Sequence, residues 1–263
     1  MFGPEIQPIG AHRFSGPDVQ VRDALQRVGP LYGQRRNNFR CGPDQHLLSG
    51  GIGRRRREQV ADILLRTGVA LLEDDPYGQL RFSGEPVPPI AALPGMAAQT
   101  ILLNSMSKVM APGLRIGWMR TEGVLGKILG IAKSAVTLQS PALNQLAVAH
   151  YLTHYDLDAH IARVVVPYRE RRDAMHAGLL RMLPPTASVT RPDGGMFCWV
   201  RLGDDTDTAA LLPRAVEEGV AFVPGWSFYA TDPDRSTMRL SYVTNSPETI
   251  AEGLSRLQTA LER

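Results

Sequence analysis

The sequence predicts an α/β protein in which an incomplete, mainly parallel sheet is followed by a small C-terminal α+β domain. Short continuous apolar runs at 69–72 and 101–103 have the length of strands and are typical of parallel strands buried on both faces. Segments with apolar residues at helical spacing lie before and after these runs. A long helical segment, 161–183, precedes strands of a different, alternating pattern, which indicates a second and smaller unit.

The first unit begins with a helix, because Val60, Ile63 and Leu64 have helical spacing within 57–66. Thr67-Gly68 is a typical helix end. We then expect strands at 69–72, 101–103 and 116–119, and helices around 124–135 and 143–155.

The second unit begins with the long helix 161–183, which Pro167 should kink because its ring removes one backbone hydrogen bond. In 238–243 the apolar residues Met238, Leu240 and Tyr242 alternate with polar ones, as in a half-buried strand. We also expect a strand at 196–202, a helix at 208–218 and a strand at 220–223. A last helix begins at the cap Ser246-Pro247, and its apolar stripe consists of Ile250, Leu254, Leu257 and Leu261.

Composition excludes several classes of protein. The net charge of +3 is too small to indicate a nucleic-acid partner, although the pI is 9.0. No apolar run approaches the roughly 20 residues of a membrane span, and the N-terminus lacks the pattern of a signal peptide. Two cysteines make no disulfide framework, so we expect a cytoplasmic protein. The arginine run 54–57 is better explained as a solvated helix start than as a DNA contact.

The segment 105–115, Ser-Met-Ser-Lys-Val-Met-Ala-Pro-Gly-Leu-Arg, carries the most informative chemistry. Only three of the 29 basic residues are lysines, and one of them, Lys108, lies in this polar turn. Lysine can lose its proton and form a Schiff base, whereas arginine stays charged. Taken alone, Lys108 would be better explained as a solvated loop residue, and it is the surrounding residues that favour a chemical role.

Polar side chains lie at the ends of all three expected strands. Asp74 and Tyr77 follow the first strand, Ser105 and Lys108 follow the second, and Arg115 directly precedes the third. Ligands of open α/β sheets bind beyond the carboxyl ends of the strands, so these groups are expected to share one crevice. An amine, a carboxylate, hydroxyls and an arginine fit an aldehyde cofactor with a ring nitrogen and a phosphate tail. Singly, the aspartate could cap a turn and the arginine could pair with a helix end.

From about Arg57 to its end, the sequence resembles the pyridoxal-phosphate-dependent aminotransferases of class I/II and fold type I. It is similar to their aminoadipate, aromatic and branched-chain branch. The resemblance is carried by the segments 73–82, 105–118, 194–197 and 238–241.

The resemblance implies a role for each matching residue. Lys108 matches the catalytic Schiff-base lysine, Asp74 the partner of the pyridinium nitrogen, and Tyr77 the phenol bonded to the ring oxygen. Ser105, Ser107 and Arg115 match phosphate ligands, and Arg239 matches the clamp for the substrate α-carboxylate. The implied reaction moves an amino group between an amino acid and a 2-oxo acid in a homodimer, with pyridoxal 5'-phosphate and no metal ion.

The N-terminal part of the family pattern is missing, so we expect an N-terminally truncated member. No Asn-Pro turn precedes Asp74, and Gly50-Gly51-Ile52-Gly53 does not resemble the family's phosphate loop. Residues 1–53 are expected to be poorly organised, with 33–53 a non-native reading of the family region caused by a shifted frame, a truncated gene or a mis-assigned start. The expected domains are then a partial cofactor-binding domain at 54–160, and a linker helix with the small domain at 161–263.

Three functions remain open from the sequence. The first is an active aminotransferase, and the second is the ligand-sensing domain of a transcription regulator that shares this fold. The third is an inactive fragment, because a sheet that lacks strands exposes edges and apolar faces. We therefore expect weak cofactor affinity and low stability unless a partner chain completes the site. The substrate side chain is not specified by the sequence.

Overall fold

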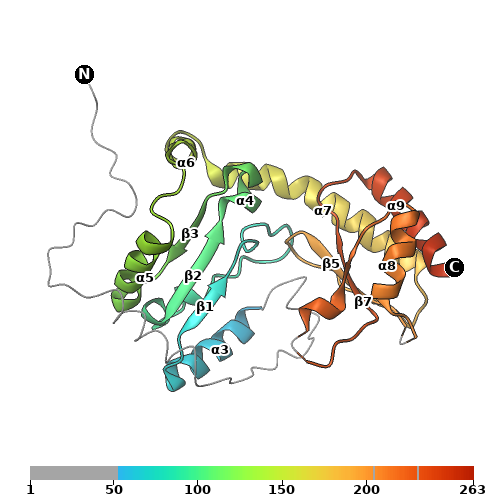
Figure 1. Cartoon of the computed structure of the whole chain (residues 1–263), viewed down its shortest axis with the longest axis horizontal. Coiled ribbons are helices and arrows are strands. Elements are labelled where there is room, and N and C mark those ends of the chain that lie inside the picture. The colour runs from blue at the N-terminus through green and yellow to red at the C-terminus, as the bar shows by residue number, and fades with distance from the viewer. Residues whose placement is uncertain (1–52, 204, 230) are drawn as a thin grey trace.

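The computed structural model describes residues 53–203, 205–229 and 231–263. The expectations for residues 1–52, including a non-native reading from residue 33 onward, lie outside this part of the chain. Two units, each with its own sheet, lie at opposite ends of the long helix α7 (Leu157–Met182), as Figure 1 shows. Helix α7 begins before the expected residue 161 because the Asp156 side chain caps it, accepting a hydrogen bond from the Ala159 amide.

The first sheet has the order β1-β2-β3, with strands β1 (Leu71–Asp74), β2 (Thr100–Ser105) and β3 (Gly117–Arg120). Strands β1 and β2 are parallel, as expected, but β3 runs antiparallel to β2. The expectation of a third parallel strand at 116–119 is therefore wrong. The connection from β2 to β3, residues 106–116, is shorter than the dozen or so residues that a parallel crossover needs.

The two faces of this sheet differ in burial. On one face, Leu71 packs against Ala61 and Leu64 of helix α3 (Arg54–Thr67). On the other face, Leu72 is 54% exposed and Met119 is 45% exposed. The expectation that 69–72 is buried on both faces is therefore wrong for the described part of the chain, where α3 covers only one side.

The expected helices of the first unit are confirmed. Helix α3 ends at Gly68, which takes the left-handed conformation (φ 68°) and donates its amide to the Leu64 carbonyl. The other helical elements are α4 (Met106–Val109), α5 (Gly123–Val136), α6 (Ala142–His154) and the short 3₁₀ turns η1 (Ile90–Ala92), η2 (Ala97–Gln99) and η3 (Pro112–Leu114).

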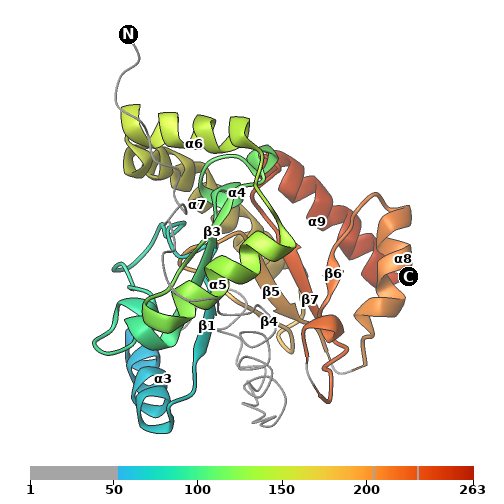
Figure 2. The same ribbon diagram turned by 60° about the vertical axis from the view of Figure 1, so that its left-hand side comes forward.

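The second sheet has the order β4-β5-β7-β6, and all of its neighbouring strands are antiparallel. Figure 2 shows α9 alongside α7, with α8 beyond it. The elements are β4 (Ser188–Val189), β5 (Phe197–Arg201), α8 (Thr208–Glu217), β6 (Val223–Pro224), η4 (Gly225–Phe228), β7 (Thr237–Ser241) and α9 (Pro247–Glu262). The strand expected at 220–223 is thus reduced to two residues, Val223 and Pro224.

One face of the second sheet forms the main core of this unit. Met238, Leu240 and Tyr242 are buried there, which confirms the alternation predicted for 238–243. Leu254 and Leu257 of α9 pack in the same cluster. Ser246 caps α9 as expected, because its hydroxyl accepts a hydrogen bond from the Thr249 amide at 3.3 Å.

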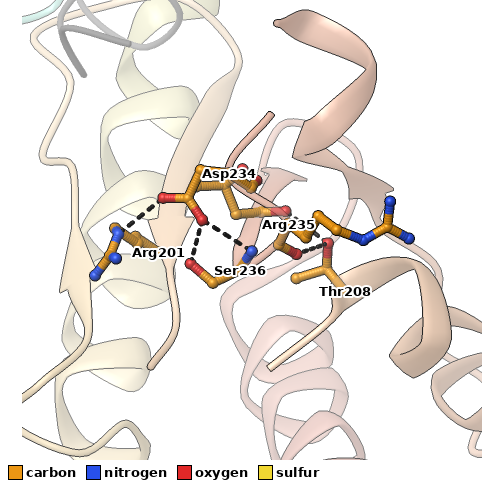
Figure 3. A network of polar contacts seen from close by, with 6 residues as sticks. Arg201, Thr208, Asp234, Arg235 and Ser236 are labelled. Carbon is orange, nitrogen blue, oxygen red and sulfur yellow. Dashed lines mark hydrogen bonds and ion pairs between the residues drawn. The ribbon is translucent and has the colours of Figure 1, made fainter. Parts of the chain in front are cut away.

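A polar network fixes the start of β7, as Figure 3 shows. The Asp234 carboxylate accepts hydrogen bonds from Arg201 of β5 at 2.8 Å and from the Ser236 hydroxyl at 2.6 Å. Thr208, at the N-terminus of α8, donates to the carbonyl of Arg235 at 3.0 Å. These contacts fix the start of β7 against β5 and against the N-terminus of α8.

Within the described ranges, no helix has the length and apolar character that crossing a bilayer requires.

Candidate active site

The first sheet brings four candidate residues to one edge. Asp74, the last residue of β1, pairs with Leu103, and Ser105, the last residue of β2, pairs with Gly117 at the start of β3. Because β3 is antiparallel to β2, Arg115 lies at the same edge as the carboxyl ends of β1 and β2. Lys108 follows in α4, directly after β2. The antiparallel direction that sequence reasoning missed is what places Arg115 beside the others.

Asp74 and Ser105 lie on the same face of the sheet. Alternate residues of a strand share a face, and the pairing of Asp74 with Leu103 puts Leu72, Asp74, Leu103 and Ser105 on one side. This is the side that α3 leaves open, where Leu72 is exposed. A ligand therefore has access to both polar groups from this face.

Lys108 is held in the single turn of α4. The Ser105 hydroxyl caps the turn, because it accepts a hydrogen bond from the Ser107 amide at 3.1 Å. Met106 and Val109 on either side of the lysine are buried in a common cluster with Leu80. Lys108 is half-buried, and its amine has no hydrogen-bond or ion-pair partner among the described residues. It is therefore positioned by its neighbours while its nitrogen remains available.

Arg115 has a backbone conformation that is unusual for a residue with a side chain. Its φ of 51° and ψ of 36° are left-handed, at the end of the turn η3. Such a conformation costs roughly 1–2 kcal/mol for an L-amino acid. Strained residues cluster at binding sites. The Arg115 side chain is exposed, and no acidic side chain in the described ranges pairs with it.

Tyr77 and Arg239 meet where the two units touch. The Tyr77 ring packs edge-on against the ring of Phe197 in β5, with centroids 5.9 Å apart. The Arg239 guanidinium lies over the rings of Phe197 and Phe228, 4.1 Å and 4.7 Å from their centroids. Burial raises the pKa of Tyr77, the positive charge of Arg239 opposes that rise and the negative charge of Asp74 adds to it. The phenol therefore keeps its proton at neutral pH and can donate a hydrogen bond.

The Gly194-Gly195 turn joins the second unit to the segment that follows Tyr77. The Gly195 amide donates to the Leu80 carbonyl at 2.8 Å, and the Phe82 amide donates to the Asp193 carbonyl at 2.9 Å. Gly194 pairs with Arg81 in an isolated bridge, and Tyr242 donates its hydroxyl to the Gly194 carbonyl at 3.2 Å.

A buried arginine also holds this turn. Arg172 of α7 is 1% exposed, donates to the carbonyl of Pro192 and lies over the ring of Phe82 at 4.8 Å. Sequence reasoning missed Arg172 and the aromatic contacts of Arg239. Phe197 lies inside 194–197, one of the segments that carry the family resemblance, so the sequence did offer a signal for it. Arg172 had none, because it is one of many arginines on a long helix.

Several charged groups of the described chain are paired with one another, whereas most of the candidate residues have no polar partner there. Arg57 pairs with Glu73, and Arg201 pairs with Asp234. By contrast, the side chains of Asp74, Tyr77, Lys108, Arg115 and Arg239 make no hydrogen bond or ion pair within the described ranges. Ser105 is an exception, since its hydroxyl caps α4 and lies 3.4 Å from the Ile116 carbonyl. Cys198, the cysteine within the described ranges, is buried, and burial raises its pKa to about 12, so it is no nucleophile.

Comparison with known proteins identifies the family of the chain. The family described as aminotransferase class I and II matches residues 54–257. An aromatic-amino-acid aminotransferase of Thermococcus litoralis is 38% identical over 211 residues, which are 80% of this chain and 50% of that protein. A 2-aminoadipate transaminase of Thermus thermophilus is 36% identical over 99% of this chain and 64% of its own length. The chain thus spans about half to two thirds of the length of the curated relatives it matches.

A solved structure shares the fold. The kynurenine aminotransferase of Pyrococcus horikoshii superposes with a TM-score of 0.76 at 36% identity, covering 81% of this chain and 53% of that one. The α/β fold of type I expected from the sequence is therefore confirmed. More distant matches include uncharacterised HTH-type transcriptional regulators, such as one of Bacillus subtilis that is 29% identical over 76% of the chain.

Proposed function

The chain belongs to the aminotransferases of class I and II, and on that basis we propose that it moves an amino group between an amino acid and a 2-oxo acid. The observation that carries the proposal is the set of unpaired polar groups where the two units meet. Asp74, Lys108 and Arg115 lie at one edge of the first sheet. Tyr77 and Arg239 share the ring of Phe197 at the same junction.

The residues present fit pyridoxal 5'-phosphate as the cofactor. Arg115 carries the planar fork of donors that matches a phosphate, and no side chain of the described ranges is bonded to that fork. Lys108 supplies the amine for an aldehyde, Asp74 an acceptor for a ring N–H, and Tyr77 a donor for a ring oxygen. Ser105 and Ser107 are proposed as further phosphate ligands. Ser105 keeps this role only if its hydroxyl proton turns from the Ile116 carbonyl, a contact that is long at 3.4 Å.

The cofactor, when bound, supplies the electron sink that makes the α-proton of the substrate removable. The protein's own residues do the rest. Arg239 binds the α-carboxylate and thereby orients the α-carbon toward Lys108. The Nζ atom of Lys108, once uncharged, takes the α-proton as a general base. Asp74 holds a proton on the ring nitrogen through its carboxylate, and Tyr77 donates its phenol proton to the ring oxygen.

The same fold can also serve a sensor that binds a cofactor without turning over a substrate. The similarity to transcriptional regulators, at 29% identity, is the observation that favours this second function. The two functions differ in outcome, since an enzyme releases a 2-oxo acid and a sensor does not.

A half-reaction separates these functions. Purified protein with pyridoxal 5'-phosphate should show a visible absorbance band that is lost in Lys108→Ala. One of the twenty L-amino acids should then bleach the band and release an equal amount of its 2-oxo acid. A band that no amino acid bleaches supports the sensor, and a wild type without a Lys108-dependent band refutes both.

The proposed partners are the two substrates and a second copy of the chain in the cytoplasm. Val136, the last residue of α5, and Leu138, which follows the helix, are 86% and 94% exposed, and apolar side chains of this kind are what a second subunit would cover. No nucleic-acid or membrane partner is proposed. Sedimentation of the wild type should show a dimer, and Leu138→Asp should raise its dissociation constant. A wild type that stays monomeric at high concentration would contradict the proposed dimer.

A further inference from the structure

Two aromatic side chains contact the guanidinium of Arg239, and we propose that Phe197 and Phe228 are positioning residues that hold it ready for a substrate carboxylate. This inference rests on the proposed function and extends it. It assigns the orientation of the clamp to two rings that belong to different elements of the second unit. The centroid distances of 4.1 Å and 4.7 Å place both rings in cation–π contact.

The sheet dictates which rings can reach Arg239. Arg239 lies in the inner strand β7, opposite Trp199 of β5 and Val223 of β6. Phe197 is two residues from Trp199, so it lies on the same face of β5 and diagonally across from Arg239. This is the face opposite to the core, because Cys198, Val200, Met238 and Leu240 point into the core cluster.

Phe228 reaches the guanidinium from a separate segment. It is the last residue of η4, which follows the edge strand β6. The ring of Trp199 packs edge-on against the Phe228 ring with centroids 5.6 Å apart, and Trp199 is only 3% exposed. A buried tryptophan therefore supports Phe228, and Phe228 in turn contacts Arg239.

The aromatic contacts hold the charge without using its hydrogen-bond donors. Arg201, in the neighbouring strand, donates its Nε–H to the Asp234 carboxylate at 2.8 Å, so part of its donor set is already used. No described carboxylate pairs with Arg239. The ring faces attract the cation electrostatically, while its N–H groups stay free for the two parallel hydrogen bonds that a carboxylate accepts.

Loss of one ring should therefore weaken carboxylate binding. A free arginine side chain must be ordered when it binds, and that ordering is already complete when two rings hold it. Loss of the cation–π contact and of this ordering corresponds to roughly a 3- to 10-fold loss of affinity. The loss should appear in binding of the carboxylate and not in the chemical step.

The test compares Phe228→Leu, which removes the π face, with Phe228→Tyr, which keeps it. Trp226→Leu is the matched control, because Trp226 is an exposed aromatic residue of the same short segment whose ring makes no cation–π contact with Arg239. The probe is 3-phenylpropionate, titrated calorimetrically into the cofactor-loaded protein, with the neutral 3-phenylpropionamide as a second ligand. Thermal unfolding of each variant reports whether the fold is retained.

We expect Phe228→Leu to weaken binding of 3-phenylpropionate about 5-fold, while the tyrosine variant and the control stay within twofold of wild type. In steady-state turnover the same variant should raise KM and leave kcat within twofold. The inference is overturned if Phe228→Leu binds the carboxylate like wild type, if Trp226→Leu loses as much, or if wild type prefers the amide. The absorbance band that depends on Lys108 tests the proposed function separately, so either can fail alone.

Discussion

Gly194→Ala should destabilise the protein far more than Gly195→Ala, although the two residues are neighbours in one turn. A Cβ atom on Gly194 would lie 2.5 Å from the Leu80 carbonyl oxygen and 2.9 Å from the Arg81 Cα atom. Both are backbone atoms that no rotamer change can move. Ordinary contact begins near 3.4 Å, so the turn must retreat by about 0.9 Å from the segment after Tyr77.

That retreat breaks hydrogen bonds between the two units. The bonds at risk are from the Gly195 amide to Leu80, at 2.8 Å, and from the Phe82 and Ser83 amides to Asp193, at 2.9 Å and 3.0 Å. At about 1 kcal/mol net for each, the loss is about 3 kcal/mol. At Gly195 a Cβ meets nothing within 4 Å, and only the positive φ of 79° opposes it, at a cost of roughly 1–2 kcal/mol.

Urea unfolding followed by tryptophan fluorescence measures both free energies of unfolding. The expected difference between the two variants is about 1–2 kcal/mol, with Gly194→Ala the less stable. If Gly194→Ala is as stable as Gly195→Ala, the turn is not held against the Tyr77 segment in the way described.

Three further predictions follow from single residues. Arg115→Gly should raise the free energy of unfolding by about 1 kcal/mol, because it relieves a left-handed φ of 51°, and should weaken binding of pyridoxal 5'-phosphate in an absorbance titration; a drop in stability would contradict the strain. Partial burial raises the pKa of Asp234, but hydrogen bonds from Ser236 and Arg201 together lower it by more, so that the pKa lies below its usual value. The ionised carboxylate therefore stabilises the fold above the unfolded-state pKa of about 3.9, and this stabilisation is lost as pH falls through the lower folded-state pKa. Between pH 7 and pH 2, the midpoint temperature of thermal unfolding should fall less in Asp234→Asn than in wild type. An equal fall of the midpoint in the two proteins would refute this prediction. Cys198, whose pKa burial raises to about 12, should react with a thiol reagent only after unfolding; peptide mass spectrometry distinguishes it from Cys41, and fast labelling of Cys198 in the folded protein would show that it is accessible.

Local patterns predicted most of the second unit. The alternation of Met238, Leu240 and Tyr242 reports burial directly, because a strand that faces a core on one side needs that period. The Ser246 cap depends only on residues within four positions of it. The positions of Lys108, Asp74 and Arg115 near strand ends were also predictable, because the apolar runs that form the strands stop at recognisable points in the sequence.

Features that depend on distant residues were not predictable in the same way. An apolar run at 69–72 indicates a strand, but whether Leu72 is covered depends on elements elsewhere in the chain, and in the described part it is exposed. The direction of β3 was predictable in principle from the short connection before it. The rings around Arg239 come from β5 and η4, which no spacing in the sequence connects.

The central claim is that Lys108 holds the cofactor, and the chain offers its own controls because it has only two other lysines, Lys127 and Lys133. Both of these lie on α5, and both are exposed. Reduction of the cofactor-loaded protein with borohydride fixes the cofactor to the amine that holds it, and peptide mass spectrometry locates that amine. We expect the added mass on the peptide that contains Lys108 and not on those of the other two lysines. Labelling of Lys127 or Lys133 at the same level, or no labelling of Lys108, would contradict it.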